Sequence, residues 1–148
     1  MSVTTLKKLF ARDLGRLYKE MEAYGNEAVI WHIHGKIANS GGNLCLHLIG
    51  NLNTFIGKEL GQTTYVRDRD SEFALKDIPR SELLEKIKAT DAVVSAALDK
   101  LNDADLAKEY PIPVFEEKTS TEYMLIHLAT HLTYHLGQIN YHRRLLDV

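Results

Sequence analysis

Four stretches of this 148-residue sequence predict an all-α fold. In each stretch, apolar residues recur at intervals of three and four, which places them on one side of an α-helix. The segments between them are rich in polar and turn-forming residues and leave room only for short irregular strands. Four amphipathic helices bury their apolar faces most simply against one another, so we predict a four-helix bundle. Two of the connections are long enough to act as crossovers, so helices that follow each other in the chain need not be neighbours.

The first predicted helix runs from Thr5 to about Ala23 and ends at Gly25. Its apolar residues fall on one stripe: Leu6, Leu9, Phe10, Leu14, Leu17 and Met21. The connection that follows contains Trp31, the only tryptophan of the chain, and is expected to form an ordered segment packed on the helices.

The second predicted helix is capped by Ser40 or Asn39 and ends at Gly61. His47 lies among leucines on its apolar side. A glycine in the middle of a helix costs about 1 kcal/mol relative to alanine. Gly50 therefore indicates that a neighbouring helix approaches closely at this point.

Residues 62 to 76 are mostly charged or polar and predict a long surface crossover. Pro79 is placed in the first turn of a third helix, which continues toward Asn102. A fourth helix then runs nearly to the C-terminus. For its start we predict a capping box made by Thr119 and Glu122.

The last helix carries three histidines at intervals of four, which point the same way from an α-helix. His127 and His135 are eight residues apart, about 12 Å along the axis, so one ion cannot bind all three. The pair His131 and His135 is preferred because Gln138 follows one turn later and could orient a ligand. The pair His127 and His131 is the alternative.

His47 supplies the third nitrogen of the predicted site. An unpaired imidazole among leucines would be unfavourable to bury, and a metal ion would give it a partner. Asn51, one turn later, could orient a ligand or a water, or could be a surface amide. Three imidazoles leave one position of a tetrahedral ion open, as catalytic sites require. The predicted metal ligands are His47, His131 and His135.

The cysteine and the histidines outside the predicted site are interpreted mainly as structural or surface residues. Cys45 points about 200° away from His47 on the second helix and is expected to be a small core residue. His142 is assigned to a surface turn near the C-terminus, where it would interact with the helix dipole. His32 and His34 could line an entrance to the site or be merely solvated.

The composition favours one domain spanning residues 1–148. The chain is 45% hydrophobic, has three prolines and has a formal net charge of −2. The charges are dispersed, so nucleic acid is not an expected partner. No stretch approaches the roughly 20 apolar residues needed to span a bilayer, so a membrane is not expected either. A single cysteine excludes an internal disulfide and agrees with a cytoplasmic location.

The segments NSGGNLCLHLIGNL (residues 39–52) and HLTYHLGQINYHRRL (residues 131–145) together resemble the DinB-like superfamily of four-helix bundles, also described as YfiT-like metalloenzymes. The resemblance covers essentially the whole chain. It implies one metal-binding histidine on helix two and two on helix four, matching His47, His131 and His135. It also implies a divalent ion, with zinc or nickel preferred and iron or manganese as alternatives. A low-molecular-weight thiol as co-substrate and a homodimer are further implications.

We therefore expect a metal-dependent enzyme that acts on a small molecule, as a thiol S-transferase or a hydrolase. One alternative is a non-catalytic metal-binding protein whose ion joins two helices; the other is a metal-free bundle. The open metal position is expected inside the bundle toward one end, facing a pocket walled by residues 31–34 and 65–73. The aromatic residues Tyr24, Trp31 and Phe115 in connections would suit a dimer interface.

Overall fold

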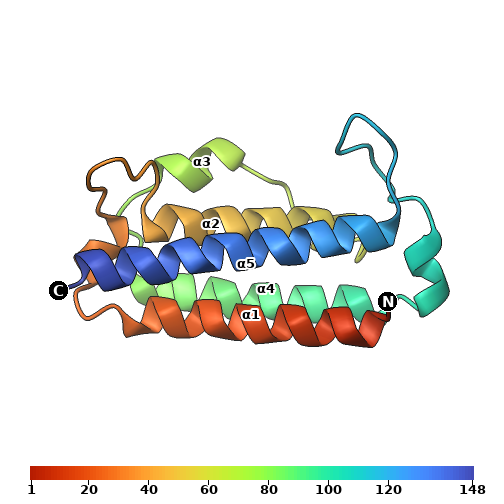
Figure 1. Cartoon of the computed structure of the whole chain (residues 1–148), viewed down its shortest axis with the longest axis horizontal. Helices are drawn as coiled ribbons and strands as arrows, with labels where there is room; N and C mark the ends of the chain where they lie inside the picture. The colour runs from red at the N-terminus through yellow and green to blue at the C-terminus, as the bar shows by residue number, and fades with distance from the viewer.

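The computed structural model describes residues 1–148 and is all-α, as predicted (Figure 1). Four long helices lie side by side: α1 (Val3–Ala23), α2 (Gly41–Leu52), α4 (Arg80–Asp99) and α5 (Thr121–Leu146). The structure contains no strand, only an isolated bridge between Glu109 and Ser120. The four long helices agree with the four apolar-periodic stretches of the sequence.

The helices are not arranged in chain order. Helix α1 packs against α4 and α5, and α2 packs against the same two helices. Helices α1 and α5 run in one direction while α2 and α4 run in the other (Figure 1). This arrangement makes α2 and α5, which carry the predicted metal ligands, antiparallel neighbours.

Because α2 and α4 run in the same direction, the chain must return along the whole length of α2 before α4 begins. The returning segment contains a short helix, α3 (Arg69–Ala74), which the sequence analysis did not predict. Asp68 caps it by accepting a hydrogen bond from the Ser71 backbone N–H at 3.2 Å. Helix α3 packs on α2 (Figure 1). The predicted surface crossover therefore includes a helix that covers α2.

Three further short helical elements complete the fold. Two are 3-10 helices, η1 (Glu27–Trp31) and η3 (Asp103–Ala107). The third, η2 (Asn53–Lys58), is a π-helix that continues α2. The hydroxyl group of Tyr110 donates to the Phe55 carbonyl within it, at 2.5 Å. The second predicted helix thus continues as far as Lys58, three residues before its predicted end at Gly61, with a change of helical type.

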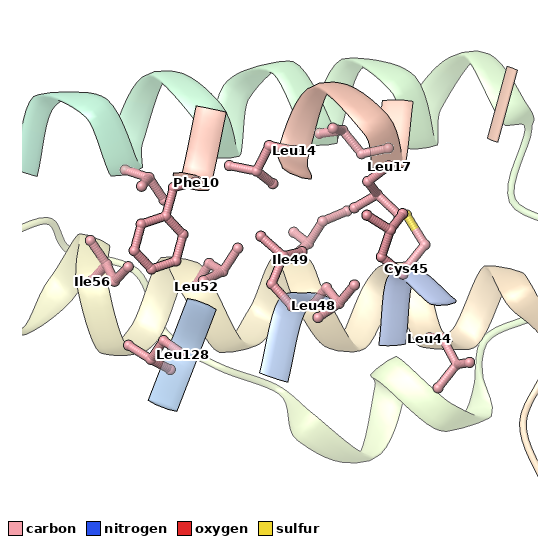
Figure 2. Close-up of a cluster of buried hydrophobic side chains, with 14 of the residues drawn as sticks. Phe10, Leu14, Leu17, Leu44, Cys45, Leu48, Ile49, Leu52, Ile56 and Leu128 are labelled. Atoms are coloured by element: carbon pink, nitrogen blue, oxygen red, sulfur yellow. The ribbon is translucent and has the colours of Figure 1, made fainter. Parts of the chain in front are cut away.

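Helix α2 is the most buried element of the chain, since all twelve of its residues are buried. Figure 2 shows Phe10, Leu14 and Leu17 of α1 facing the apolar side of α2. Cys45 lies in this core and is fully buried, as predicted. Burying a leucine side chain contributes about 2 kcal/mol, so the leucines of α2 contribute much of the packing energy.

The caps of α2 and α5 show how well local signals place a helix start. Ser40 caps α2, as predicted, by accepting a hydrogen bond from the Asn43 N–H at 3.1 Å. The capping box predicted at Thr119 is wrong, because Ser120 caps α5. The Thr119 carbonyl accepts from the Tyr110 N–H at 2.9 Å, which keeps this residue in an extended segment.

His142 is buried and does not lie in a surface turn, so that prediction is wrong. Its Nδ1 is 2.7 Å from the Tyr24 hydroxyl, and its Nε2 is 2.8 Å from the His32 carbonyl. A carbonyl only accepts, so Nε2 carries the proton and Nδ1 accepts from Tyr24. The buried imidazole therefore joins α5 to the segment that follows α1.

Tyr24 and Trp31 are also buried, at 1% and 7% exposure. The six-membered ring of Trp31 packs where Gly42 leaves room for it. Of the three aromatic residues from which a dimer interface was argued, only Phe115 is exposed. The homodimer stays a prediction that rests on the family resemblance. None of the helices combines the length and the apolar character needed to cross a membrane.

The burial of His142 predicts a pH dependence of stability. Burial lowers the pKa of this imidazole, so the unfolded chain takes up its proton first as the pH falls. The contribution of His142 to stability is complete above the unfolded pKa of about 6.5 and is lost toward the lower, folded pKa. Between about pH 7 and pH 5, the free energy of unfolding should fall more steeply for the wild type than for His142→Gln. Urea denaturation of the metal-free proteins measures both slopes, and equal slopes would contradict the prediction.

Candidate metal centre

The structure brings His47 of α2 together with His131 and His135 of α5. One ring nitrogen from each residue can be chosen so that all three lie within 4.8 Å of one another. The Nε2 atoms of His47 and His131 are 3.2 Å apart. The rings of His131 and His135 meet edge to face, with centroids 4.5 Å apart. Residues that are far apart in the sequence thus form one compact group of nitrogen donors.

His127 does not belong to this group of nitrogens. Its ring centroid is 6.3 Å from that of His131 and 5.0 Å from the ring of Phe115. It therefore packs against the connection ahead of α5. Of the two histidine pairs considered from the sequence, the structure groups His131 and His135 with His47.

Glu72 of α3 is a site residue that the sequence analysis missed. Its Oε1 is 3.1 Å from Nδ1 of His47, and it is only 6% exposed. Arg67 holds this carboxylate with two hydrogen bonds, at 2.9 Å from Nε and 3.0 Å from Nη2. A carboxylate accepts hydrogen bonds, so it keeps the His47 proton on Nδ1 and leaves Nε2 free to bind an ion.

Arg67 also lies close to the imidazole, with Nη2 3.3 Å from Nδ1 of His47. Both atoms are donors once Nδ1 carries its proton, so this contact does not act as a hydrogen bond. The shorter contact with Glu72 decides the tautomer.

Gln138 has the same role for His135. Its side-chain oxygen is 2.7 Å from Nδ1 of His135. With the amide in this orientation, His135 donates from Nδ1 and its Nε2 is free. The predicted contact between Gln138 and His135 is confirmed.

Burial and charge keep two of the imidazoles neutral at ordinary pH. Burial, followed by the neighbouring imidazoles, lowers the pKa of His131 to about 4. Burial also lowers the pKa of His47, against the opposing effect of Glu72. Metal binding needs neutral imidazoles, so these side chains are ready to act as ligands near pH 7.

The arrangement fits a divalent metal ion. Two nitrogen ligands of a tetrahedral zinc ion, each about 2.0–2.1 Å from it, stand about 3.3 Å apart. The two Nε2 atoms of His47 and His131 already have nearly this separation. Nδ1 of His131 is buried without a hydrogen-bond partner, and so is Oδ1 of Asn51, one turn after His47 on α2. Asn51 is buried, so its interpretation as a surface amide is wrong.

Gly50 is the sequence signal that could have led to Glu72. A Cβ atom at this position would lie 1.8 Å from Oε2 of Glu72. The close approach predicted from this glycine is thus made by the carboxylate of α3. Asn43 fixes α3 in place, because its side-chain amide donates to the carbonyls of Glu72 and Leu75 at 2.9 and 2.8 Å.

The site lies between α2 and α5 on the side that α3 covers. The prediction that it lies inside the four helices is wrong. Apart from residues of α2 and α5, His47 contacts Arg67, Glu72 and Phe73. The segment 65–73 therefore borders the site, as predicted. Trp31 and His32 have other contacts, because Trp31 packs on Gly42 and His32 binds His142. Residues 36–39 instead line a groove that Gln138 shares.

The close approach of Glu72 predicts that Gly50→Ala destabilises the protein. The added methyl group must displace a buried, paired carboxylate, and overpacking of this kind costs about 1–3 kcal/mol. Gly15→Ala is the matched control, since a Cβ there meets nothing within 4 Å in the middle of α1. That substitution should stabilise the protein by about 0.5–1 kcal/mol. Chemical denaturation of both variants provides the measurement, and a gain of stability in both would contradict the assignment.

One family model matches this chain over residues 3–147, and its description is "Protein of unknown function (DUF1572)". No curated protein matches the chain. Since the match covers nearly the whole chain, the protein belongs to the DUF1572 family of proteins of unknown function.

Proposed function

We propose that this protein is a divalent-metal-dependent enzyme that acts on a small molecule. Its ion is held by His47, His131 and His135 and keeps one coordination position open. Helices α2 and α5 position these ligands, and Glu72 and Gln138 orient two of them. The geometry of this three-histidine group is the observation that carries the proposal.

The surroundings of the three imidazoles favour an open site over a closed structural one. A structural zinc site completes its shell with a fourth protein ligand, whereas a catalytic site uses three. The nearest carboxylate, Glu72, is hydrogen-bonded to Nδ1 of His47, on the opposite side of that ring from Nε2, and is engaged by Arg67. It therefore supports a ligand and is not positioned as a ligand itself.

The donor set favours zinc or nickel, with iron or manganese as alternatives, because neutral imidazoles suit these ions. A divalent ion bound here would act as a Lewis acid and lower the pKa of a bound water or thiol. The protein contributes the orientation of the ligands. Glu72 and Gln138 each hold a proton on Nδ1 of their histidine and so keep the other nitrogen available.

We place the chain, as a single four-helix-bundle domain, in the DinB-like superfamily. The two sequence segments that carry the resemblance are the ones that supply the three histidines. The 31 buried apolar residues form one core cluster, which supports a single domain. By this resemblance we favour thiol transfer over hydrolysis, with a low-molecular-weight thiol as co-substrate. A homodimer and a cytoplasmic location complete the proposal.

The alternative is a non-catalytic protein in which the ion joins α2 to α5. It is favoured by the fact that the three ligands come from two neighbouring helices, so that binding would stabilise the fold. Thermal unfolding with and without the ion separates the two proposals. An enzyme should keep its helical signal when the ion is removed, whereas a structural site should lose it at ordinary temperature.

The ligand assignment predicts the metal content of variants. The double variant His131→Ala/His135→Ala should lose stoichiometric metal, because only one of the three nitrogens remains. His127→Ala is the matched control, from the same face of α5, and should keep full occupancy. Metal analysis of the purified, dialysed proteins measures this. Full occupancy in the double variant would mean that other residues bind the ion.

The contact between Glu72 and His47 predicts a second effect. Glu72→Gln retains the shape of the side chain but loses its charge, and the loss of such a partner weakens metal binding about 10- to 100-fold. Competition with a chelator at constant pH measures the affinity. Glu82→Gln, an exposed carboxylate on α4, should leave the affinity unchanged. Equal affinities in all three proteins would remove Glu72 from the site. Thiol-transfer and hydrolase assays of the metal-loaded wild type then test for activity.

A further inference from the structure

A groove adjoins the candidate metal centre, and its walls and charges restrict what can bind there. We infer that it holds the apolar body of a small anionic molecule whose acidic group, a carboxylate or a thiolate, binds at the open metal position. This inference rests on the proposed function and assigns a substrate class to it.

The charge at the site favours an anion. The three ligands are neutral imidazoles, so they leave the double positive charge of the ion uncompensated. The only carboxylate in contact with them is Glu72, and Arg67 pairs with it through two hydrogen bonds. The positive charge of Arg67 cancels that of Glu72. An anionic group at the open position would therefore be bound more strongly than a neutral one.

The position of the groove follows from the antiparallel packing of α2 and α5. Leu44 lies one turn before His47 on α2, and Gln138 lies one turn after His135 on α5. Both residues line the groove. The groove therefore continues the contact line between α2 and α5 from the metal centre by about one helical turn.

The walls of the groove are mainly apolar. Ile37 and Ala38 border it from the connection ahead of α2, and Tyr141 and Leu145 border it from α5. The volume is about 390 Å³, which is within the usual range of small-molecule sites. Tyr141 and Leu145 are 65% and 64% exposed, so a ligand would bury apolar surface that is now open to water.

Lys36 carries the only full charge among the lining residues, and it is exposed at the rim. His142, which also borders the groove, has both nitrogens engaged by Tyr24 and His32 and stays neutral. The groove thus has no acidic residue and one basic residue. Its electrostatics match those of the metal centre, so both parts select for a negatively charged ligand.

Binding of six-carbon probes to the zinc-loaded protein tests the inference. Hexanoate is an anion in solution, and 1-hexanethiol binds as its thiolate by releasing its proton to the buffer at the ion. The neutral control is 1-hexanol. We expect either hexanoate or hexanethiol to bind at least about tenfold more tightly than hexanol, because only they bring a charge to the ion. Tighter binding of hexanoate would indicate a carboxylate as the acidic group, and tighter binding of hexanethiol would indicate a thiolate. Titration calorimetry measures all three affinities.

Substitutions in the groove test whether the apolar part of the ligand binds there. Ala38→Trp should fill the groove and weaken binding of the preferred probe at least about tenfold while the metal content is unchanged. Lys36→Ala should weaken binding about two- to threefold at low salt, as expected for an exposed charge. Lys118→Ala, an exposed lysine in the connection ahead of α5, is the matched control and should have no effect.

The possible failures are distinguishable. If the wild type takes up none of zinc, nickel, iron and manganese, the proposed function itself is wrong. If it takes up zinc but binds hexanol as tightly as both other probes, the inferred anionic class is overturned. If the preferred probe binds Ala38→Trp as tightly as the wild type, the groove is not the site of its apolar body.

Discussion

The contact of α3 with α2 organises the candidate site. Helix α2 is buried on every side, and the side facing away from the core is covered by α3. Two features of α2 make this possible: Asn43 binds the carbonyls at the end of α3, and Gly50 leaves space for the carboxylate of Glu72. Because a buried carboxylate needs partners, Arg67 and His47 are drawn to the same point. The orientation of His47 is thus a consequence of how α3 is held.

The order of the helices has an equally direct effect on chemistry. If each long helix packed only on the one before it in the chain, α2 and α5 would not be in contact. Their contact depends on the path of the connection between α2 and α4. Here α2 and α4 run in the same direction, so the connecting segment must return along α2. That return path carries Arg67, Glu72 and Phe73 over the site. The same crossover therefore sets the helix order and supplies residues around the imidazoles.

The three histidines differ in the hydrogen-bond partners of their Nδ1 atoms, which suggests different roles in metal binding. His47 and His135 each have a polar partner on Nδ1, whereas Nδ1 of His131 is buried without one. A hydrogen-bond partner holds an imidazole in one tautomer and one orientation. Two ligands are thus preoriented, while His131 is held by packing between its neighbours on α5 and the ring of His47.

The sequence by itself determined the elements and the donors. Periodic apolar residues set the four long helices, Ser40 marked the start of α2, and the histidine spacing limited an ion to one adjacent pair on α5. These are local properties, which depend only on residues within one or two helical turns. The buried state of His142, the cap at Ser120 and the role of Glu72 were decided by tertiary structure. His142 contacts Tyr24, Thr119 contacts Tyr110, and Glu72 contacts His47 of α2. The partners in each of these contacts lie more than two helical turns apart in the chain, so no local pattern records them. Gly50 is the intermediate case: its position in mid-helix indicated a close neighbour, but only the packed structure identified that neighbour as a carboxylate.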